Sequence, residues 1–186
     1  MTRTALVRTD RYAWGAIWLH WSIAVLVVAN LILGLFHESL LDGLKWVIPA
    51  HKAIGITVLA LTFARVGWRT MYRPPVLWPE VARWERVAAK ATRAAFYLLL
   101  VALPLSGWAL ASNPDRVRPL DWFGLFPIPY LPVSAATART AGGVHGPLGW
   151  LMAGLIVLHV AAALRHHFVL RDTVLARMAP RFARNG

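Results

Sequence analysis

Histidine is the residue type whose spacing in this chain suggests cofactor chemistry. Two of the seven histidines, His145 and His159, lie in the apolar stretch VHGPLGWLMAGLIVLHV, residues 144–160. A helix turns by about 100° per residue, so this spacing falls about 40° short of four full turns and places both side chains on one face. At about 1.5 Å per residue, they are separated by about 21 Å along that face. Histidine is costly to bury in hydrocarbon, and it marks functional positions when it occurs there.

The composition indicates an integral membrane protein. Of the 186 residues, 58% are hydrophobic and 15% are charged, and the mean hydropathy is +0.53. Soluble domains carry about 25% charged residues. The length predicts a single domain, residues 1–186. The chain has no cysteine, which excludes disulfides, cysteine-bound zinc, iron–sulfur clusters and haem attached through a C-x-x-C-H motif.

Four apolar segments are long enough to cross the hydrocarbon core, which takes about 20 residues. The predicted spans are residues 14–36, 47–68, 94–111 and 145–168. The fold class expected from them is an all-α bundle of four transmembrane helices. The first apolar run is too long for the core of a signal peptide, so we expect it to be retained as the first span.

The positive charges indicate how the bundle is oriented. Lys and Arg accumulate in the cytoplasmic loops of membrane proteins. In this chain they gather at the N-terminus, between the second and third spans, and after the fourth. Both termini are therefore predicted to lie in the cytoplasm. The formal net charge of +12 reflects this bias, and we expect no nucleic-acid partner.

Two connecting segments have distinct compositions. Residues 74–93, PPVLWPEVARWERVAAKATR, predict a basic amphipathic helix at the cytoplasmic interface. Residues 121–132, DWFGLFPIPYLP, are apolar and aromatic, and their prolines prevent a long helix. We expect this second segment to cover the outer end of the bundle.

The predicted orientation pairs four histidines by depth. The first span enters from the cytoplasm and places His20 about two turns deep, and the fourth span places His159 at the same level as it returns. His51 and His145 fall in the first turns of spans that start outside. We therefore predict two pairs, His20 with His159 and His51 with His145.

Facing imidazoles on neighbouring helices can bind the iron of one haem from both sides. Small residues near the pairs leave room for such a ring: Gly55, Gly146, Gly149, Ala153, Ala161, Ala162 and Ala163. A path for metal ions is the alternative, but such a path normally recruits carboxylates, and the spans contain essentially none. The favoured interpretation is two b-type haems, and the alternative is a histidine-based metal-ion transporter.

The other three histidines lie at the ends of spans. His37 follows the first span and is expected to be solvated. His166 and His167 are predicted at the cytoplasmic end of the fourth span, near Arg165 and Arg171. They either anchor the helix end at the interface, where positive charge suits the helix dipole, or bind a quinone and relay its protons.

The chain also resembles the bacterial cytochrome b561 family of four-span dihaem proteins. The matching pieces follow family order and are WLHWSIA at 18–24, AHKAIGITVLALTFARVGWR at 50–69, FYLLLVALPLSGW at 96–108, DWFGLFPIPYL at 121–131, VHGPLGWLMAGLIVLHVAAALRHHF at 144–168 and LARMAP at 175–180. The resemblance implies that His20, His51, His145 and His159 are the axial haem ligands. It further implies one haem near each membrane face, ubiquinone reached from the cytoplasmic side, and His166 near that quinone.

One departure from the family pattern concerns the residues before the FYLLL motif. Members often carry histidines one and two turns earlier, where this chain has Lys90 and Arg93. Neither replaces imidazole at iron, so we expect these two residues to contact haem propionates instead.

The resemblance implies a superoxide:ubiquinone oxidoreductase in the bacterial inner membrane. Superoxide is an anion, and four cations predicted to face outward either attract it or are ordinary loop residues. These cations are Lys52, Arg116, Arg118 and Arg139. Related subfamilies are b-type subunits of hydrogenases and dehydrogenases, so a role as electron-transfer anchor for a redox partner protein is the alternative.

Overall fold

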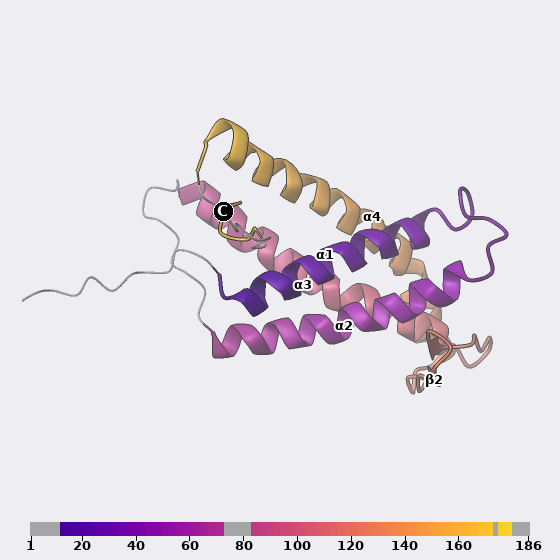
Figure 1. The fold of residues 1–186 in the computed structure, drawn as a ribbon. Helices are drawn as coiled ribbons and strands as arrows, with labels where there is room; N and C mark the ends of the chain where they lie inside the picture. Colours follow the sequence, from indigo (N-terminus) through magenta and orange to yellow (C-terminus); the bar gives the residue numbers. More distant parts are fainter. Residues whose placement is uncertain (1–11, 73–82, 173–174, 180–186) are drawn as a thin grey trace, which may run out of the picture.

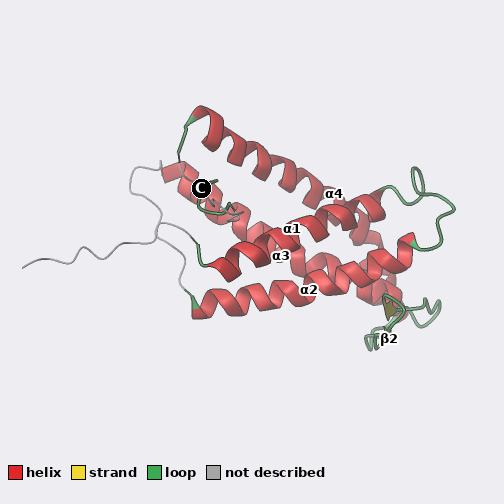
Figure 2. Ribbon diagram, viewed as in Figure 1, coloured by secondary structure: helices red, strands yellow, loops and turns green. Residues whose placement is uncertain are grey.

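The computed structural model describes residues 12–72, 83–172 and 175–179. Within these ranges, four helices are long and apolar enough to cross a membrane, which confirms the predicted all-α class (Figures 1 and 2). They are α1 (Trp14–Leu35), α2 (Val47–Met71), α3 (Arg83–Ala111) and α4 (Ala135–Leu164). Helix α4 continues into a short π-helix, η1 (Arg165–Val169). A small hairpin, β1 (Asp121–Trp122) and β2 (Phe126–Pro127), lies between α3 and α4.

The helices run up and down, so that each end of the bundle collects four helix termini. One end, which we call the tail end, holds the starts of α1 and α3 and the finishes of α2 and α4; the hairpin lies at the opposite end, the hairpin end (Figure 1). Consecutive helices pack on each other, whereas α1 and α4 touch only sparsely. No Cα atoms of α2 and α4 lie within 8 Å of each other in the described residues. The backbones of α2 and α4 therefore stay apart, and we call the space between them, which side chains partly fill, the open region of the bundle.

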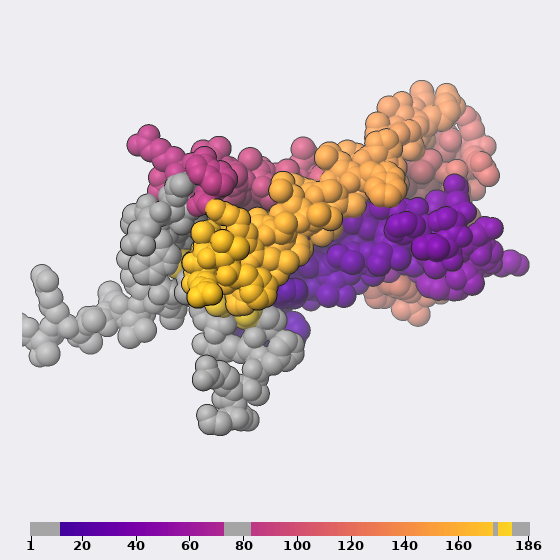
Figure 3. Space-filling view, turned by 90° about the horizontal axis from the view of Figure 1, so that it is seen from above, coloured from indigo at the N-terminus to yellow at the C-terminus, as the bar shows by residue number. Residues whose placement is uncertain are grey.

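The outside of the bundle is apolar. Large side chains such as Val25, Leu98, Val157 and Leu158 are 61–70% exposed. Burying such surface in hydrocarbon instead of water is favourable, so these faces suit a lipid bilayer. The space-filling view shows α4 running along this surface, with the residues that follow it at the tail end (Figure 3).

A buried apolar layer joins all four helices halfway along the bundle. It consists of Ile23, Val27, Val58, Leu99, Leu100 and Met152. This layer lies between the two levels at which the histidines occur, so it separates a site at the hairpin end from one at the tail end.

Helix α3 begins earlier than the predicted third span. The sequence predicted an interfacial helix in 74–93 followed by a span from Ala94, but residues 83–111 form one continuous helix. Residues 83–93 contain neither Gly nor Pro and are rich in Ala and Arg, so nothing interrupts the helix between the two predicted parts. Residues 74–82 of the predicted interfacial helix lie outside the described residues.

Helix α4 also begins before its predicted start. The hydropathy pattern predicted a start at His145, but Ser134 caps the helix by accepting a hydrogen bond from the Thr137 backbone N–H at 3.1 Å, and α4 begins at Ala135. The prediction that His145 lies in the first turn of this helix was therefore wrong, because His145 lies well inside α4. It still lies level with His51, because the additional turns of α4 precede the apolar run.

The segment 121–132 covers the hairpin end of the bundle, as predicted. The Trp122 indole N–H donates to Thr57 Oγ1 on α2 at 3.0 Å. Leu120 and Ile128 are buried against Ala111 at the end of α3. These contacts hold the connection over the end of α2 and α3, beside the open region of the bundle.

Candidate functional site

The structure brings His51 and His145 together near the hairpin end. Their ring centres are 5.9 Å apart and their planes cross at 88°. His51 comes from α2 and His145 from α4, two helices whose backbones stay apart. The predicted pairing of these two residues is thus found, and the side chains reach toward each other across the open region of the bundle.

The hydrogen bonds of this pair leave the same nitrogen free on both rings. His51 Nδ1 lies 3.0 Å from the backbone oxygen of Asn30, which only accepts, so Nδ1 carries the proton. His145 Nδ1 lies 2.9 Å from Ser106 Oγ, whose own proton is donated to the Leu103 oxygen at 2.8 Å. His145 therefore donates to Ser106. Both Nε2 atoms keep a lone pair for a metal, and their partners fix the ring orientation.

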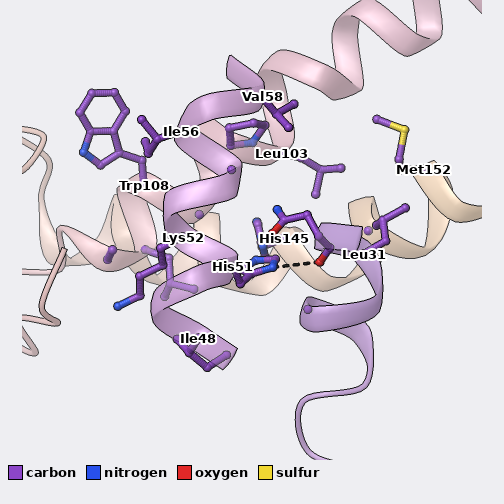
Figure 4. Close-up of a pocket in the computed structure, with 18 of the residues that line it drawn as sticks. Leu31, Ile48, His51, Lys52, Ile56, Val58, Leu103, Trp108, His145 and Met152 are labelled. Atoms are coloured by element: carbon purple, nitrogen blue, oxygen red, sulfur yellow. Dashed lines mark hydrogen bonds between the residues drawn. The ribbon is translucent and has the colours of Figure 1, made fainter. Parts of the chain in front are cut away.

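A cavity of about 400 Å³ surrounds the pair (Figure 4). Apolar side chains including Leu31, Leu103 and Met152 line it together with the two histidines. This volume falls in the range of about 300–1,000 Å³ that is typical of sites for small molecules and cofactors.

Two glycines allow the rings to lie against neighbouring helices. A Cβ on Gly34 would lie 2.6 Å from His51 Cε1, and one on Gly107 would lie 3.0 Å from His145 Cε1. Sequence reasoning missed both glycines, and it also missed Asn30 and Ser106. A polar residue within an apolar span was the available signal for Ser106. Asn30 acts through its backbone oxygen, which any residue would supply, and nothing in the sequence distinguishes these glycines from ordinary packing residues.

Three charged or titratable side chains lie at the polar edge of this cavity. Lys52 Nζ donates to the Pro119 backbone oxygen at 2.8 Å, and Arg118 Nη1 donates to the Leu110 oxygen at 3.3 Å. Both residues line the cavity, and so does His37, which was expected to be solvated. His37 is instead half-buried, because its Nδ1 bonds the Gly34 backbone oxygen at 2.8 Å and keeps the ring against the end of α1.

The other two predicted outward cations lie apart from the cavity lining. Arg139 forms an exposed ion pair with Asp115 at 3.0 Å, and Arg116 is exposed. The structure thus brings Lys52 and Arg118 to the cavity around the histidine pair, and it leaves Arg116 and Arg139 on the surface.

The second pair, His20 and His159, lies toward the tail end. The ring centres are 6.4 Å apart and the planes cross at 82°. The Phe96 ring of α3 packs edge-on against His159, with 5.3 Å between ring centres. The pair therefore bridges α1 and α4, which otherwise touch only sparsely.

The hydrogen bonding of His20 differs from that of the hairpin-end pair. Arg65 Nη1 of α2 lies 3.0 Å from His20 Nδ1. A guanidinium only donates, so His20 Nδ1 is the acceptor here. Sequence reasoning missed this contact, although an arginine inside an apolar span was a signal for it.

The two candidate quinone histidines have different surroundings in and around η1. His166 is half-buried, and its Nδ1 lies 2.5 Å from Asp172 Oδ2. His167 is exposed and packs against the Phe168 ring. An ion pair between Arg165 and Glu85, at 3.2 Å, ties this end of α4 to the start of α3. Single-turn π-helices of this kind are frequent at functional sites.

The structure places the two predicted propionate contacts on α3. Lys90 is exposed and Arg93 is half-buried. Neither forms a hydrogen bond or ion pair with another of the described residues, so their predicted role stays a prediction.

Both histidine pairs fit a haem iron held from two sides. Metal–imidazole bonds are about 2 Å long, so two imidazoles on one iron have ring centres about 6 Å apart. The observed separations of 5.9 and 6.4 Å agree with this spacing. Within the described residues, no group of three or more His, Asp or Glu side chains is arranged to hold a metal ion. Pairs of imidazoles suit a metal whose remaining ligands come from a macrocycle.

Comparison with known proteins agrees with this geometry. The sequence profile of the family described as prokaryotic cytochrome b561 matches residues 11–181. Cytochrome b561 homolog 2 of Escherichia coli (strain K12) is 38% identical over 173 residues, which is 91% of each chain. Cytochrome b562 of Cereibacter sphaeroides is 30% identical and covers 86% of this chain and 89% of its own. The probable superoxide oxidase CybB of Yersinia pestis is 29% identical and covers 92% of this chain and 97% of its own.

The profile match includes all four helices and both histidine pairs, and the match to the first of these relatives covers 91% of the chain. The apolar helices suit a bilayer, and the paired imidazoles suit haem iron. The chain belongs to the prokaryotic cytochrome b561 family, and it is accordingly a haem b-binding electron-transfer protein of a bacterial membrane.

Proposed function

We propose that this protein is a dihaem superoxide oxidase of the bacterial inner membrane, which oxidises superoxide at the hairpin end and reduces ubiquinone at the tail end. The observation that carries the proposal is the presence of two histidine pairs at two levels of α4. His51 and His145 would hold one haem b, and His20 and His159 the other. When bound, these groups supply reversible one-electron oxidation and reduction.

The histidine pairs favour electron transfer over oxygen chemistry. Two histidines would hold each haem, and a haem held in this way would transfer electrons and would not bind dioxygen. Asn30 and Ser106 hold the hairpin-end rings in fixed orientations, which limits the rearrangement that a change of charge at the site requires.

The proposed orientation places the hairpin end in the periplasm. Basic side chains of the described residues are frequent at the tail end, including Arg69, Arg83, Arg86, Arg165 and Arg171. This bias supports a cytoplasmic tail end, with both termini on that side.

The proposed superoxide site is the edge of the hairpin-end cavity. Lys52 and Arg118 line this cavity, and their positive charge raises the local concentration of an anion. The name of the Yersinia pestis relative, a probable superoxide oxidase, supports this choice of donor. Two superoxide anions release two electrons and two molecules of dioxygen.

The proposed quinone site lies beside η1. Ubiquinone takes up the two electrons with two protons to become ubiquinol. Asp172 orients His166 through Nδ1. When the ring is doubly protonated, its Nε2–H would donate a hydrogen bond to a quinone carbonyl and transfer that proton. His167 is exposed at the same helix end and is a second candidate for proton delivery.

The test is superoxide-driven quinone reduction by the purified protein. Superoxide is added anaerobically to oxidised protein with a ubiquinone analogue, and ubiquinol is measured. We expect ubiquinol to form, formation to stop when superoxide dismutase is added, and the rate to fall with salt. Full reduction of the haems by dithionite without reduction by superoxide would refute the proposal and favour an electron-transfer anchor for a partner dehydrogenase.

A further inference from the structure

We infer that the tail end of α2 carries a carboxylate-binding pocket, built around Arg65 and Trp68, that receives a propionate of the cofactor held by His20 and His159. This inference rests on the proposed function, because it requires a haem at the tail-end pair. It assigns a role to two residues of α2 and predicts which part of the cofactor they recognise.

Arg65 is a positive charge that has no anionic partner among the described residues. It lies within a helix that is apolar enough to span a membrane, where a charged side chain is costly and normally has a partner. In the described part of the chain no carboxylate forms an ion pair with Arg65. The two described carboxylates at this end, Glu85 and Asp172, pair with Arg165 and His166. The missing negative charge must therefore come from outside these residues.

The hydrogen bond from Arg65 to His20 opposes the expected role of His20. A histidine that binds metal through Nε2 normally donates its other N–H to an acceptor, as His51 and His145 do. At His20, however, Nδ1 accepts a hydrogen bond from the Arg65 guanidinium and so carries no proton of its own. A carboxylate beside Arg65 would accept the guanidinium protons and free His20 Nδ1 to carry its own proton.

Trp68 supplies a second donor that has no acceptor. Its indole Nε1 is buried and forms no hydrogen bond within the described structure. Trp68 follows Arg65 by three residues, so both side chains lie on the same face of α2. Gly15 permits this position, because a Cβ there would lie 2.5 Å from the Trp68 ring. A buried donor without an acceptor is costly, and a carboxylate would satisfy it.

Both residues line one small pocket. Its volume is about 50 Å³, and Arg65, Trp68 and Tyr97 line it together with Ala16 of α1. A cavity needs about 10–15 Å³ of such space to hold one water, so the pocket has room for a carboxylate head. Ala16 is one turn from His20 on the tail side, so the pocket lies between the histidine pair and the tail end.

The test compares haem b with its dimethyl ester, which lacks both propionate charges. Full-length protein is reconstituted with either cofactor, and release into excess apomyoglobin is followed by absorbance. The kinetic phase of cofactor release that is missing in His159→Ala is assigned to the tail-end site. In the wild type we expect the ester to leave this site about tenfold faster than haem b, because charge-assisted hydrogen bonds are lost.

The variants separate carboxylate recognition from packing. In Arg65→Gln we expect haem b to leave about as fast as the ester, with the rate for the ester unchanged. Trp68→Phe keeps an aromatic ring, although a smaller one, and removes the N–H donor, and we expect a smaller change in the same direction. Arg83→Gln removes a positive charge from an exposed position at the start of α3. In this variant the release rate of the ester relative to that of haem b should be the same as in the wild type. Arg65→Lys, which keeps the charge but not the forked donors, should give an intermediate ratio and serves if Arg65→Gln does not fold.

Two results would overturn the inference: equal acceleration of both cofactors by Arg65→Gln, or a wild-type ratio in both Arg65→Lys and Trp68→Phe. Failure of the proposed function gives different results. Wild-type protein that holds haem at one site only would refute the dihaem assignment. Two bound haems without superoxide-driven quinone reduction would refute the activity and leave the pocket standing.

Discussion

At the scale of single residues, the hydrogen-bond partners of the histidines determine which ring nitrogen can bind a metal. Asn30 and Ser106 accept from Nδ1 of His51 and His145, so Nε2 is free on both rings of the hairpin-end pair. At the tail-end pair, Arg65 donates to His20. The two sites therefore differ in the hydrogen-bond partners of their histidines, although both pairs have similar ring separations.

Replacing Ser106 by alanine tests the role of such a partner. Ser106→Ala removes the acceptor for His145 Nδ1–H, and loss of a partner of this kind costs about 10- to 100-fold in metal affinity. We expect the hairpin-end haem to be released about tenfold faster or more, with the tail-end haem unaffected. Ser39→Ala, in the exposed turn after α1, is the control. Equal effects on both haems would contradict this account.

Gly34 provides a steric test of the same pair. A Cβ on Gly34 would lie 2.6 Å from His51 Cε1, so Gly34→Ala must displace the His51 ring. We expect purified Gly34→Ala to contain about half of the wild-type haem, measured by pyridine haemochrome. Gly154→Ala is the matched control, because no atom lies within 4 Å of a Cβ there. Full haem content in Gly34→Ala would show that His51 has another position in which it can bind.

The depth of the four histidines was predictable from sequence, whereas most of their partners were not. Helical rise and the orientation of the spans place His20 level with His159, and His51 level with His145. The contact between Arg65 and His20 depends on how α2 rotates against α1, and a hydropathy pattern does not contain that rotation. The same applies to Gly34, which resembles any small residue at a helix contact.

At the scale of elements, α4 carries both sites because it contributes one histidine to each pair. The sequence predicted the apolar part of this helix but not its true start, since hydropathy marks the lipid-facing part and Ser134 begins the helix before it. Helix α3 shows the same limit, because its charged first turns continue into the apolar span. The chain after α4 could not be predicted either: the Trp21 indole N–H donates to the Met178 backbone oxygen at 2.8 Å, which returns the segment 175–179 to α1.

The π-helical end of α4 leads to a prediction about the quinone. His166→Asn removes the group that would bond the quinone carbonyl and transfer its proton, and loss of general acid catalysis costs about 100-fold or more. We expect steady-state ubiquinol formation to fall by that order. Both haems should stay bound and should still be reduced by superoxide.

His167→Asn provides the comparison for this experiment. His167 is exposed, and within the described residues no carboxylate orients it as Asp172 orients His166, so we expect a smaller effect. A larger loss in His167→Asn than in His166→Asn would reverse the assignment at this helix end.

At the scale of the whole molecule, charge and shape differ between the two ends of the bundle. The hairpin end has a cavity of about 400 Å³ with Lys52 and Arg118 in its lining. The tail end has a small pocket beside Arg65 and a π-helix with His166. An apolar layer separates the two levels. This asymmetry suits a protein that receives electrons at one membrane face and delivers them at the other.

The electrostatic part of this asymmetry can be measured with one pair of variants. Lys52→Gln removes a charge from the cavity edge, and we expect the rate of reduction by superoxide to fall about three- to tenfold at low salt. Arg139→Gln removes a charge that is already paired with Asp115, so its rate should stay within about twofold of the wild type. Equal losses in both variants would indicate a general effect of net charge.

The central claim, that each histidine pair holds one haem b, is tested most directly by the haem content and redox titration of four alanine variants. We predict two haems per chain in the wild type and one in each of His20→Ala, His51→Ala, His145→Ala and His159→Ala. His51→Ala and His145→Ala should keep the same remaining haem, with one midpoint potential, and His20→Ala and His159→Ala should keep the other. A single haem in the wild type, or different remaining potentials within a pair, would contradict the claim.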